Sequence, residues 1–280
     1  MSESVPTFPR KTAAITGAAG GIGRAFCAAL ARQGFDLILL DHASGPVTEL
    51  AARLNAEFEG MTALACVADL TQPEDLDRAA ALVKQCATLE LLINGAGFGS
   101  YGTFIETDYA VQLKMMQLHV IATVRLCRVA LPGMVARGAG GVINIASISA
   151  FTRFPEISIY GPSKLFLVGF TECLQVELHK IGASRVRVQA LCPGQTRTPF
   201  TETAGMRSFD SSRVPWFMWM SAEHLVELSL KALARRSGTF IPLWRNRLFC
   251  FVFGNPLVTR PLCFLRKLGV LEAILRFLRR

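Results

Sequence analysis

The chain has 280 residues, of which 51% are hydrophobic and 18% are charged. This composition supplies apolar surface for a substantial core and excludes an intrinsically disordered chain, and the length fits one large domain or two small ones. The net charge of +9 is uneven, because residues 231–280 hold 11 Lys and Arg against one acid. A near-neutral body with a basic tail does not indicate a nucleic-acid-binding fold.

Short apolar runs alternate with longer amphipathic runs, which predicts strands separated by helices. The strands are expected at 12–17, 35–41, 62–69, 89–95, 140–147, 185–194 and 238–243. The helices are expected at 21–34, 47–58, 73–86, 105–137, 158–182 and 221–235, with Pro73 near one start and Ser221 as an N-cap. This order predicts an α/β fold, a doubly wound parallel sheet of about seven strands forming a single domain over residues 1–243.

The ends and the cysteines bear on location. We see no secretory signal at the N-terminus, and no run of about 18 uninterrupted apolar residues predicts a simple transmembrane helix. The 8 cysteines form no CxxC pair, so that buried free thiols in a reducing compartment are expected rather than a disulfide framework or a metal site. The predicted location is cytoplasmic.

A glycine-rich segment, TGAAGGIG, lies where the first strand becomes the first helix. Gly17 permits a tight turn, Gly21 removes side-chain bulk beside a pyrophosphate, and Gly23 lets the helix pack close to the sheet. The helix N-terminus would then present free N–H groups to phosphates. The alternative is a glycine-rich turn without a ligand.

Two acids end neighbouring strands. Asp41 can accept hydrogen bonds from adenosine ribose hydroxyls and would repel a 2′-phosphate, which predicts NAD over NADP. NADP stays an alternative, since a charged His42 would soften that repulsion. Asp69, beside Leu70, is expected on the adenine side. Either acid can instead be a turn residue.

With these glycines, NGAG at 94–97, Ser147, Tyr160 and Lys164 in this order, the chain resembles the short-chain dehydrogenase/reductase family over residues 12–243. The resemblance implies a Rossmann-like domain, a nicotinamide cofactor and interconversion of an alcohol with a ketone or aldehyde. It also implies that PGQTRT at 193–198 borders the nicotinamide amide. The expected cofactor contacts are Gly17, Ala19, Gly21, Ile22, Gly23, Asp41, Asp69, Leu70, Asn94, Gly95, Ala96, Tyr160, Lys164, Pro193, Gly194, Thr196 and Thr198.

The chemistry of three side chains agrees with this expectation. Tyrosine has an ordinary pKa of about 10. The Lys164 ammonium and an oxidised nicotinamide favour the tyrosinate, so Tyr160 is the predicted general acid and base. Ser147 would hold the substrate oxygen near Tyr160. Lys164 would also donate to the nicotinamide ribose.

His119 departs from the family, which usually has an Asn at this point of the helix before the fifth strand. The imidazole can donate and accept through its two nitrogens, so it can take part in a proton relay with the lysine. It can equally be a packed His between helices. We carry His119 as a candidate catalytic residue.

Residues 199–220 correspond to the segment that closes over substrate in the family. The run WFMWM at 216–220, with Phe98, Tyr101 and Phe104, predicts either an apolar substrate pocket or a lid helix packed on the core. The substrate is expected to be an apolar alcohol or ketone, lipid-like, steroid-like or retinoid-like.

Residues 244–280 are predicted to be a basic amphipathic helical extension. It either contacts an anionic membrane surface as a peripheral anchor or covers a partner subunit or the substrate cleft. The resemblance implies a homodimer or homotetramer through the helices at 105–137 and 158–181. Rival functions are a nucleotide-sensing or scaffolding protein without turnover, and another reaction on this scaffold, such as epimerisation or dehydration.

Overall fold

The computed structural model describes residues 8–235 and 238–255, and the strands of its main sheet all run parallel. Their order across the sheet is β3-β2-β1-β4-β5-β6-β9, so the chain steps outward from β1 in one direction and then in the other. The predicted Rossmann-like sheet of about seven strands is confirmed. The strands are β1 (Thr12–Thr16), β2 (Asp36–Asp41), β3 (Ala63–Val67), β4 (Leu89–Asn94), β5 (Gly140–Ile145), β6 (Val186–Leu191) and β9 (Gly238–Phe240).

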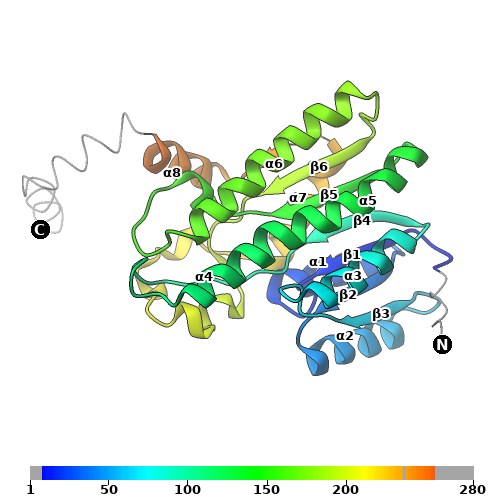
Figure 1. Ribbon diagram of the computed structural model, residues 1–280, viewed down its shortest axis with the longest axis horizontal. Helices are drawn as coiled ribbons and strands as arrows, with labels where there is room; N and C mark the ends of the chain where they lie inside the picture. The colour runs from blue at the N-terminus through cyan, green and yellow to red at the C-terminus, as the bar shows by residue number, and fades with distance from the viewer. Residues whose placement is uncertain (1–7, 236–237, 256–280) are drawn as a thin grey trace, which may run out of the picture.

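Helices cover both faces of the sheet (Figure 1). One layer contains α1 (Gly21–Ala31), α2 (Ser44–Glu57) and α7 (Ala222–Arg235). The other contains α3 (Pro73–Gln85), the continuous run of α4 (Tyr109–Met116), η1 (Gln117–Ala122) and α5 (Thr123–Arg137), and α6 (Tyr160–Lys180). In Figure 1, α5 and α6 lie across the front of the sheet and α1 lies behind it.

Successive side chains along a strand point to opposite faces of the sheet and pack into separate cores there. Along β2, Leu37 and Leu39 pack with the layer of α1, α2 and α7, whereas Ile38 and Leu40 pack with the layer of α3 and α5. All four side chains are fully buried. Because both faces of a parallel sheet are covered, its strands are continuous apolar runs, as the sequence has them.

The run α4–η1–α5 begins later than predicted, because Asp108 caps α4 by accepting a hydrogen bond from the N–H of Ala110 at 2.8 Å. This run, Tyr109–Arg137, is the one stretch of the described residues that is long and apolar enough to cross a membrane by length and composition. Met115, Leu126 and Met134 are buried in it, so packing on the sheet accounts for part of its apolar character.

Short turns connect the remaining elements. The region predicted as a lid is a series of 3-10 turns with one short two-stranded sheet, and an eighth α-helix follows β9. In chain order, the remaining elements are η2 (Ile148–Phe151) after β5, then β7 (Thr196–Arg197), η3 (Pro199–Glu202), η4 (Ala204–Met206), η5 (Ser211–Arg213), η6 (Trp216–Met218), β8 (Met220–Ser221) and α8 (Trp244–Gly254). The predicted basic extension, residues 244–280, therefore begins with α8, and its part beyond residue 255 lies outside the described residues.

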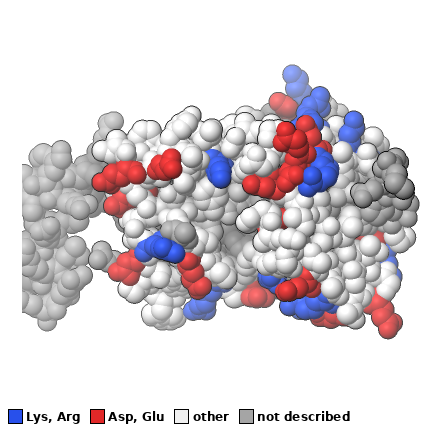
Figure 2. All heavy atoms as spheres, turned by 60° about the horizontal axis from the view of Figure 1, so that its bottom comes forward, with Lys and Arg blue, Asp and Glu red and all other residues white. Residues whose placement is uncertain are grey.

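Charged side chains are interspersed on the face shown in Figure 2, where small groups of both signs are separated by broad uncharged areas. A continuous basic surface is absent from the described residues on this face. This distribution is unlike the basic stripe of a nucleic-acid-binding protein.

Candidate active site

A single cavity of about 1100 Å³ runs along the carboxyl ends of the central strands. It lies where the chain order of the sheet reverses between β1 and β4, which is where parallel α/β sheets bind nucleotides. The predicted site residues on its wall are Gly17, Ala19, Gly21, Ile22, Gly23, Asp41, Asp69, Leu70, Gly95, Ala96, Ser147, Tyr160, Lys164, Pro193, Gly194, Thr196 and Thr198. Asn94 and His119 are not on this wall.

The glycine loop shapes one side of the cavity. Gly17 turns the chain with a positive φ of 66°, which favours glycine. No side chain caps the N-terminus of α1, so its first N–H groups suit phosphate oxygens. At Gly21 a Cβ would lie 2.5 Å from the Thr198 side chain, so this glycine makes room for Thr198 beside the loop. The residues therefore fit a dinucleotide pyrophosphate.

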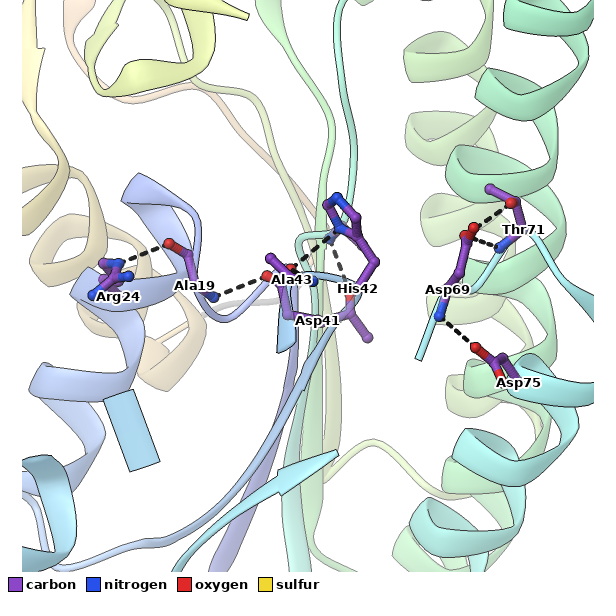
Figure 3. Close-up of polar contacts among 10 residues, drawn as sticks. Ala19, Arg24, Asp41, His42, Ala43, Asp69, Thr71 and Asp75 are labelled. Carbon is purple, nitrogen blue, oxygen red and sulfur yellow. Dashed lines mark hydrogen bonds and ion pairs between the residues drawn. The ribbon is translucent and has the colours of Figure 1, made fainter. Parts of the chain in front are cut away.

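Asp41 accepts hydrogen bonds from two loops at the end of the cavity beside the glycine loop, which we call the adenosine end (Figure 3). One carboxylate oxygen accepts the N–H of Ala19 at 2.9 Å, and the other accepts the N–H of Ala43 at 3.0 Å. The imidazole Nδ1 of His42 lies 3.2 Å from the second oxygen. Across the cavity wall, Arg24 donates from Nε to the carbonyl of Ala19 at 2.7 Å.

Asp69 lines the same end and also organises a turn, as Figure 3 shows. Its Oδ1 accepts the N–H of Thr71 at 3.0 Å and the hydroxyl of Thr71 at 2.8 Å. Burial favours the neutral acid, but the two hydrogen bonds from Thr71, together with the charges of His42 and Lys114, lower the pKa of Asp69. The two interpretations of Asp69, turn acid and cavity wall, are both compatible with its position.

Ser147, Tyr160 and Lys164 meet at the centre of the cavity. Ser147 follows β5 and caps η2, its Oγ accepting the N–H of Ser149 at 3.1 Å. Tyr160 begins α6, and its side chain is hydrogen-bonded to that of Ser147. One turn later, Lys164 is buried, its Nζ donates to the carbonyl of Ile145 at 2.9 Å, and it lies 5.7 Å from the centroid of the Tyr160 ring.

Burial dominates the protonation of this group in the protein chain alone. It raises the pKa of Tyr160 to about 12, although the hydrogen bond from Ser147 acts in the opposite direction. It lowers the pKa of Lys164 to about 8. The predicted lowering of the pKa of Tyr160 therefore does not occur in the chain alone, where desolvation is the larger effect.

His119 lies directly behind the cavity wall and is buried. Its Nε2 accepts the N–H of Phe98 at 3.3 Å, and its Nδ1 lies 2.9 Å from the hydroxyl of Ser163. That hydroxyl in turn donates to the carbonyl of Tyr160 at 2.8 Å. Burial, with a smaller contribution from Lys164, keeps the pKa of His119 well below its usual value, so the imidazole is neutral. Both ring nitrogens therefore have protein partners.

Asn94, predicted as a cofactor contact, points into the sheet instead. Its Nδ2 donates to Oδ1 of Asn144 at 2.8 Å and contacts the sulfur of Cys127 at 3.4 Å, and Asn144 donates to Thr171 at 2.9 Å. This buried network joins β4, β5, α5 and α6. The side chain supports the sheet beneath the cavity, because its amide is directed away from the wall.

The other half of the cavity is lined mainly by apolar and uncharged side chains. The charged side chains on the cavity wall are Arg24, Asp41 and Asp69 at the adenosine end, together with Lys164. Aromatic and thioether side chains line the half beyond Tyr160, namely Phe98, Tyr101, Phe154, Phe200, Met206, Phe209 and Phe249.

Of the two interpretations of residues 216–220, the structure does not support the pocket lining, since none of them lies on the cavity wall. Trp216 is 81% exposed and Met220 is buried in the core. Phe249 and Phe154 were not predicted, because neither lies in a motif and their proximity arises from contacts across about a hundred positions of chain.

Comparisons with known proteins agree with this geometry. Residues 11–207 match the short chain dehydrogenase family. The dehydrogenase/reductase SDR family member 4 of Bos taurus is 32% identical over 193 residues, 68% of this chain and 67% of that protein. The 2-keto-3-deoxy-L-fuconate dehydrogenase of Xanthomonas campestris is 30% identical over 71% of this chain and 64% of that protein.

Solved structures are similar over a larger share of the chain. A short-chain dehydrogenase from Sphingobium yanoikuyae in complex with NADPH is 33% identical, with a TM-score of 0.76 over 83% of this chain and 88% of that one. The bulky-bulky ketone specific alcohol dehydrogenase from Comamonas testosteroni is 27% identical, with a TM-score of 0.72 over 94% of both chains. The chain therefore belongs to the short-chain dehydrogenase family and is an NAD(P)-dependent oxidoreductase.

Proposed function

We propose that this enzyme interconverts a secondary alcohol and a ketone, with Tyr160 as general acid and base. The observation that carries the proposal is one continuous cavity, with a phosphate-binding helix N-terminus and Asp41 at one end and Ser147, Tyr160 and Lys164 at its centre. When bound, the nicotinamide dinucleotide supplies or accepts the hydride. The residues of the chain handle the proton and the position of the substrate oxygen.

During reduction, the Ser147 hydroxyl donates a hydrogen bond to the carbonyl oxygen and holds it beside the Tyr160 hydroxyl. Tyr160 donates its proton to this oxygen as negative charge develops there. Lys164 stabilises the resulting tyrosinate, and the direction of each proton step is reversed in alcohol oxidation. In the chain alone, with Lys164 in place, the pKa of Tyr160 is about 12, so little tyrosinate is present at neutral pH. The proposal therefore assigns the stabilisation of the tyrosinate to Lys164 together with the positive nicotinamide that would lie beside it when bound.

Replacing Tyr160 with Phe tests the mechanism and separates it from the sensing or scaffolding alternative. We expect kcat to fall by about 100-fold or more, because the proton donor is removed, while the Kd for the dinucleotide stays within a few-fold of the wild type. A variant with undiminished turnover would remove Tyr160 from the mechanism. A wild type that binds the dinucleotide but turns over no alcohol or ketone would favour the sensor.

NAD is the proposed cofactor in preference to NADP. Asp41 supports this choice, because its carboxylate, 7% exposed, presents negative charge at the adenosine end. Arg24 at the same end, and the protonated form of His42, would favour NADP. Comparing kcat/KM for the two dinucleotides tests the choice, and a preference for NADP would overturn it.

The substrate is proposed to be neutral and apolar. The half of the cavity beyond Tyr160 has no charged side chain among the described residues, so a carboxylate or phosphate would be desolvated there without a partner. The relative from Comamonas testosteroni, which is specific for ketones with two bulky groups, supports this class. A panel of steroid, retinoid, fatty and short polar alcohols tests it, and activity on the short polar alcohols alone would refute it.

A homodimer is proposed through the outer faces of α4, η1 and α6. Exposed apolar side chains gather on these helices, including Ile121 at 56%, Phe166 at 42% and Val176 at 68%. Such an apolar surface is typical of a contact between subunits. Sedimentation of the wild type and of a Phe166→Glu, Val176→Glu variant tests the assignment, since only the variant should be monomeric.

A cytoplasmic location is proposed on the cysteines. The seven in the described residues are all unpaired and five of them are buried. The membrane-contact prediction concerns residues 244–280, of which the structure describes 244–255, mostly as α8. Membrane contact by this extension stays a proposal, and its part beyond residue 255 lies outside the described residues.

A further inference from the structure

The strongest unassigned feature is the seat of helix α8 against the catalytic loop. This helix lies beyond residue 207, where the match to the family ends. It nevertheless packs on η2, the turn that follows the catalytic Ser147. The helix α6, which begins at Tyr160, packs on the same turn η2.

Contacts at both ends fix the position of α8. At its start, Leu243 has a φ of 66°, in the left-handed region, and buried Asn246 donates to the carbonyl of Pro242 at 2.9 Å. Asn246 also packs against Gly194, where a Cβ would lie 2.6 Å from its amide nitrogen. The start of the helix therefore rests on the Pro-Gly segment of the cavity wall.

At the other end, Arg153 donates from Nη1 to the carbonyl of Gly254 at 3.2 Å. Gly254 lies so close to η2 that a Cβ there would overlap the carbonyl oxygen of Phe151. Between the two ends, the Cys250 thiol faces the carbonyl of Ile148 at 4.0 Å. The catalytic loop and α8 therefore form one packed unit.

This seating brings Phe249 into the wall of the cavity, which also includes residues of the loop after β4. The ring of Phe249 lies 6.1 Å from that of Phe154 and 4.7 Å from that of Phe253, centroid to centroid, with tilted planes. Phe154 also lies on the cavity wall, whereas Phe253 does not. Two aromatic faces, one from the loop and one from α8, thus border the same apolar space.

We propose that Phe249 and Phe154 form an aromatic subsite that binds a ring substituent of a neutral ketone or alcohol, and that Phe249 determines specificity for it. This inference rests on the proposed function, because the subsite serves the carbonyl held by Ser147 and Tyr160. Tilted aromatic rings with centroids about 4.5–7 Å apart attract one another and a third ring. A phenyl group gains this contact, whereas a short alkyl group does not.

The test compares Phe249→Ala with Phe253→Ala as a matched control. Phe253 is one helical turn further along α8 and contacts Phe154 at 5.8 Å, but lies off the cavity wall. The probes are 1-phenylpropan-1-one and pentan-3-one, which share an ethyl ketone and differ in the phenyl group. We expect kcat/KM for the phenyl ketone to fall about tenfold or more in Phe249→Ala, with pentan-3-one changed by less than about threefold. In Phe253→Ala the ratio of kcat/KM for the phenyl ketone to kcat/KM for pentan-3-one should stay at the wild-type value.

A binding measurement separates failure of the subsite from failure of the reaction. Saturation-transfer NMR with oxidised dinucleotide and 1-phenylpropan-1-one reports binding without turnover. If the phenyl signal is lost in Phe249→Ala but kept in Phe253→Ala, the subsite is supported even when no ketone is reduced. Absence of turnover in the wild type would then refute only the proposed reaction. Equal effects of the two variants, or no binding to the wild type, overturn the subsite. Thermal unfolding of both variants confirms that they remain folded.

Discussion

Asp41 offers the sharpest test of the adenosine end, through the substitution Asp41→Asn. The carboxylate accepts two backbone N–H groups, from Ala19 at 2.9 Å and from Ala43 at 3.0 Å. Asn keeps one acceptor oxygen and turns an NH₂ group toward the other N–H. Losing one hydrogen bond to a charged acceptor costs about 1.5–3 kcal/mol. A loss of about 2 kcal/mol lowers Tm by about 4–8 °C in a domain of this size.

The same substitution removes negative charge from the place where a 2′-phosphate would have to bind. A unit charge at contact distance is worth about 1 kcal/mol in water and about 4 kcal/mol near a protein surface. The ratio of kcat/KM for NADP to that for NAD should therefore rise about fivefold or more. Steady-state kinetics with both dinucleotides measure the ratio, and differential scanning calorimetry measures Tm.

Asp36→Asn is the matched control, because Asp36 begins the same strand. It is buried and also accepts two backbone N–H groups, from Arg10 at 3.1 Å and Thr62 at 2.8 Å, but it lies off the cavity wall. This control should lose a similar amount of stability and keep the wild-type dinucleotide ratio. If Asp41→Asn also keeps that ratio, Asp41 does not select the cofactor.

Three further predictions follow from the site. Between about pH 8 and pH 10 the wild type should gain about 3 kcal/mol of stability relative to Lys164→Met, because the folded-state pKa of Lys164, about 8, lies below the unfolded value and the unfolded chain binds more protons at this residue. Thermal unfolding of both proteins measures this difference, which the buried thiols, with raised pKa values in both proteins, leave unchanged; parallel pH profiles would contradict it. His119→Asn should lower Tm but leave the pH–rate profile unchanged, because the imidazole is neutral and both of its nitrogens are engaged with Phe98 and Ser163. A pH–rate profile with a shifted midpoint would instead support a proton relay through His119. Gly21→Ala should weaken dinucleotide binding about tenfold, measured by titration calorimetry, since its Cβ would lie 2.5 Å from the Thr198 side chain. Adding Thr198→Gly to this variant should partly restore binding. Undiminished binding in Gly21→Ala would show that the glycine loop moves to accommodate the added methyl group.

The sequence predicted the sheet well because strand burial is a local pattern. Each strand is a short apolar run, and the acids and glycines that end β1 and β2 come to the carboxyl edge by topology alone. The partners of His119 could not be predicted, because Phe98 and Ser163 reach it from two other elements. An apolar run also does not show which way it faces, and Trp216 points to solvent.

The position of Phe249 on the cavity wall could not be predicted from the sequence either. The sequence placed the end of the domain at residue 243, where the alternation of strands and helices stops. Whether the following helix stays apart or returns to the catalytic loop depends on contacts such as Asn246 with Gly194, which leave no periodic trace. The left-handed Leu243 that turns the chain toward the loop is a residue type that gives no turn signal.

The packing of α8 on the catalytic loop also determines when the substrate end of the cavity is completed during synthesis. Arg153 and the carbonyl of Gly254, which it binds, are separated by 101 positions. A domain generally folds as a unit. The substrate end of the cavity is therefore completed only when residue 254 has left the ribosome, because its aromatic wall includes Phe249 of α8. A nascent chain that ends before α8 should lack this wall, and discrimination among substrates should appear only after the last turn of α8 has emerged.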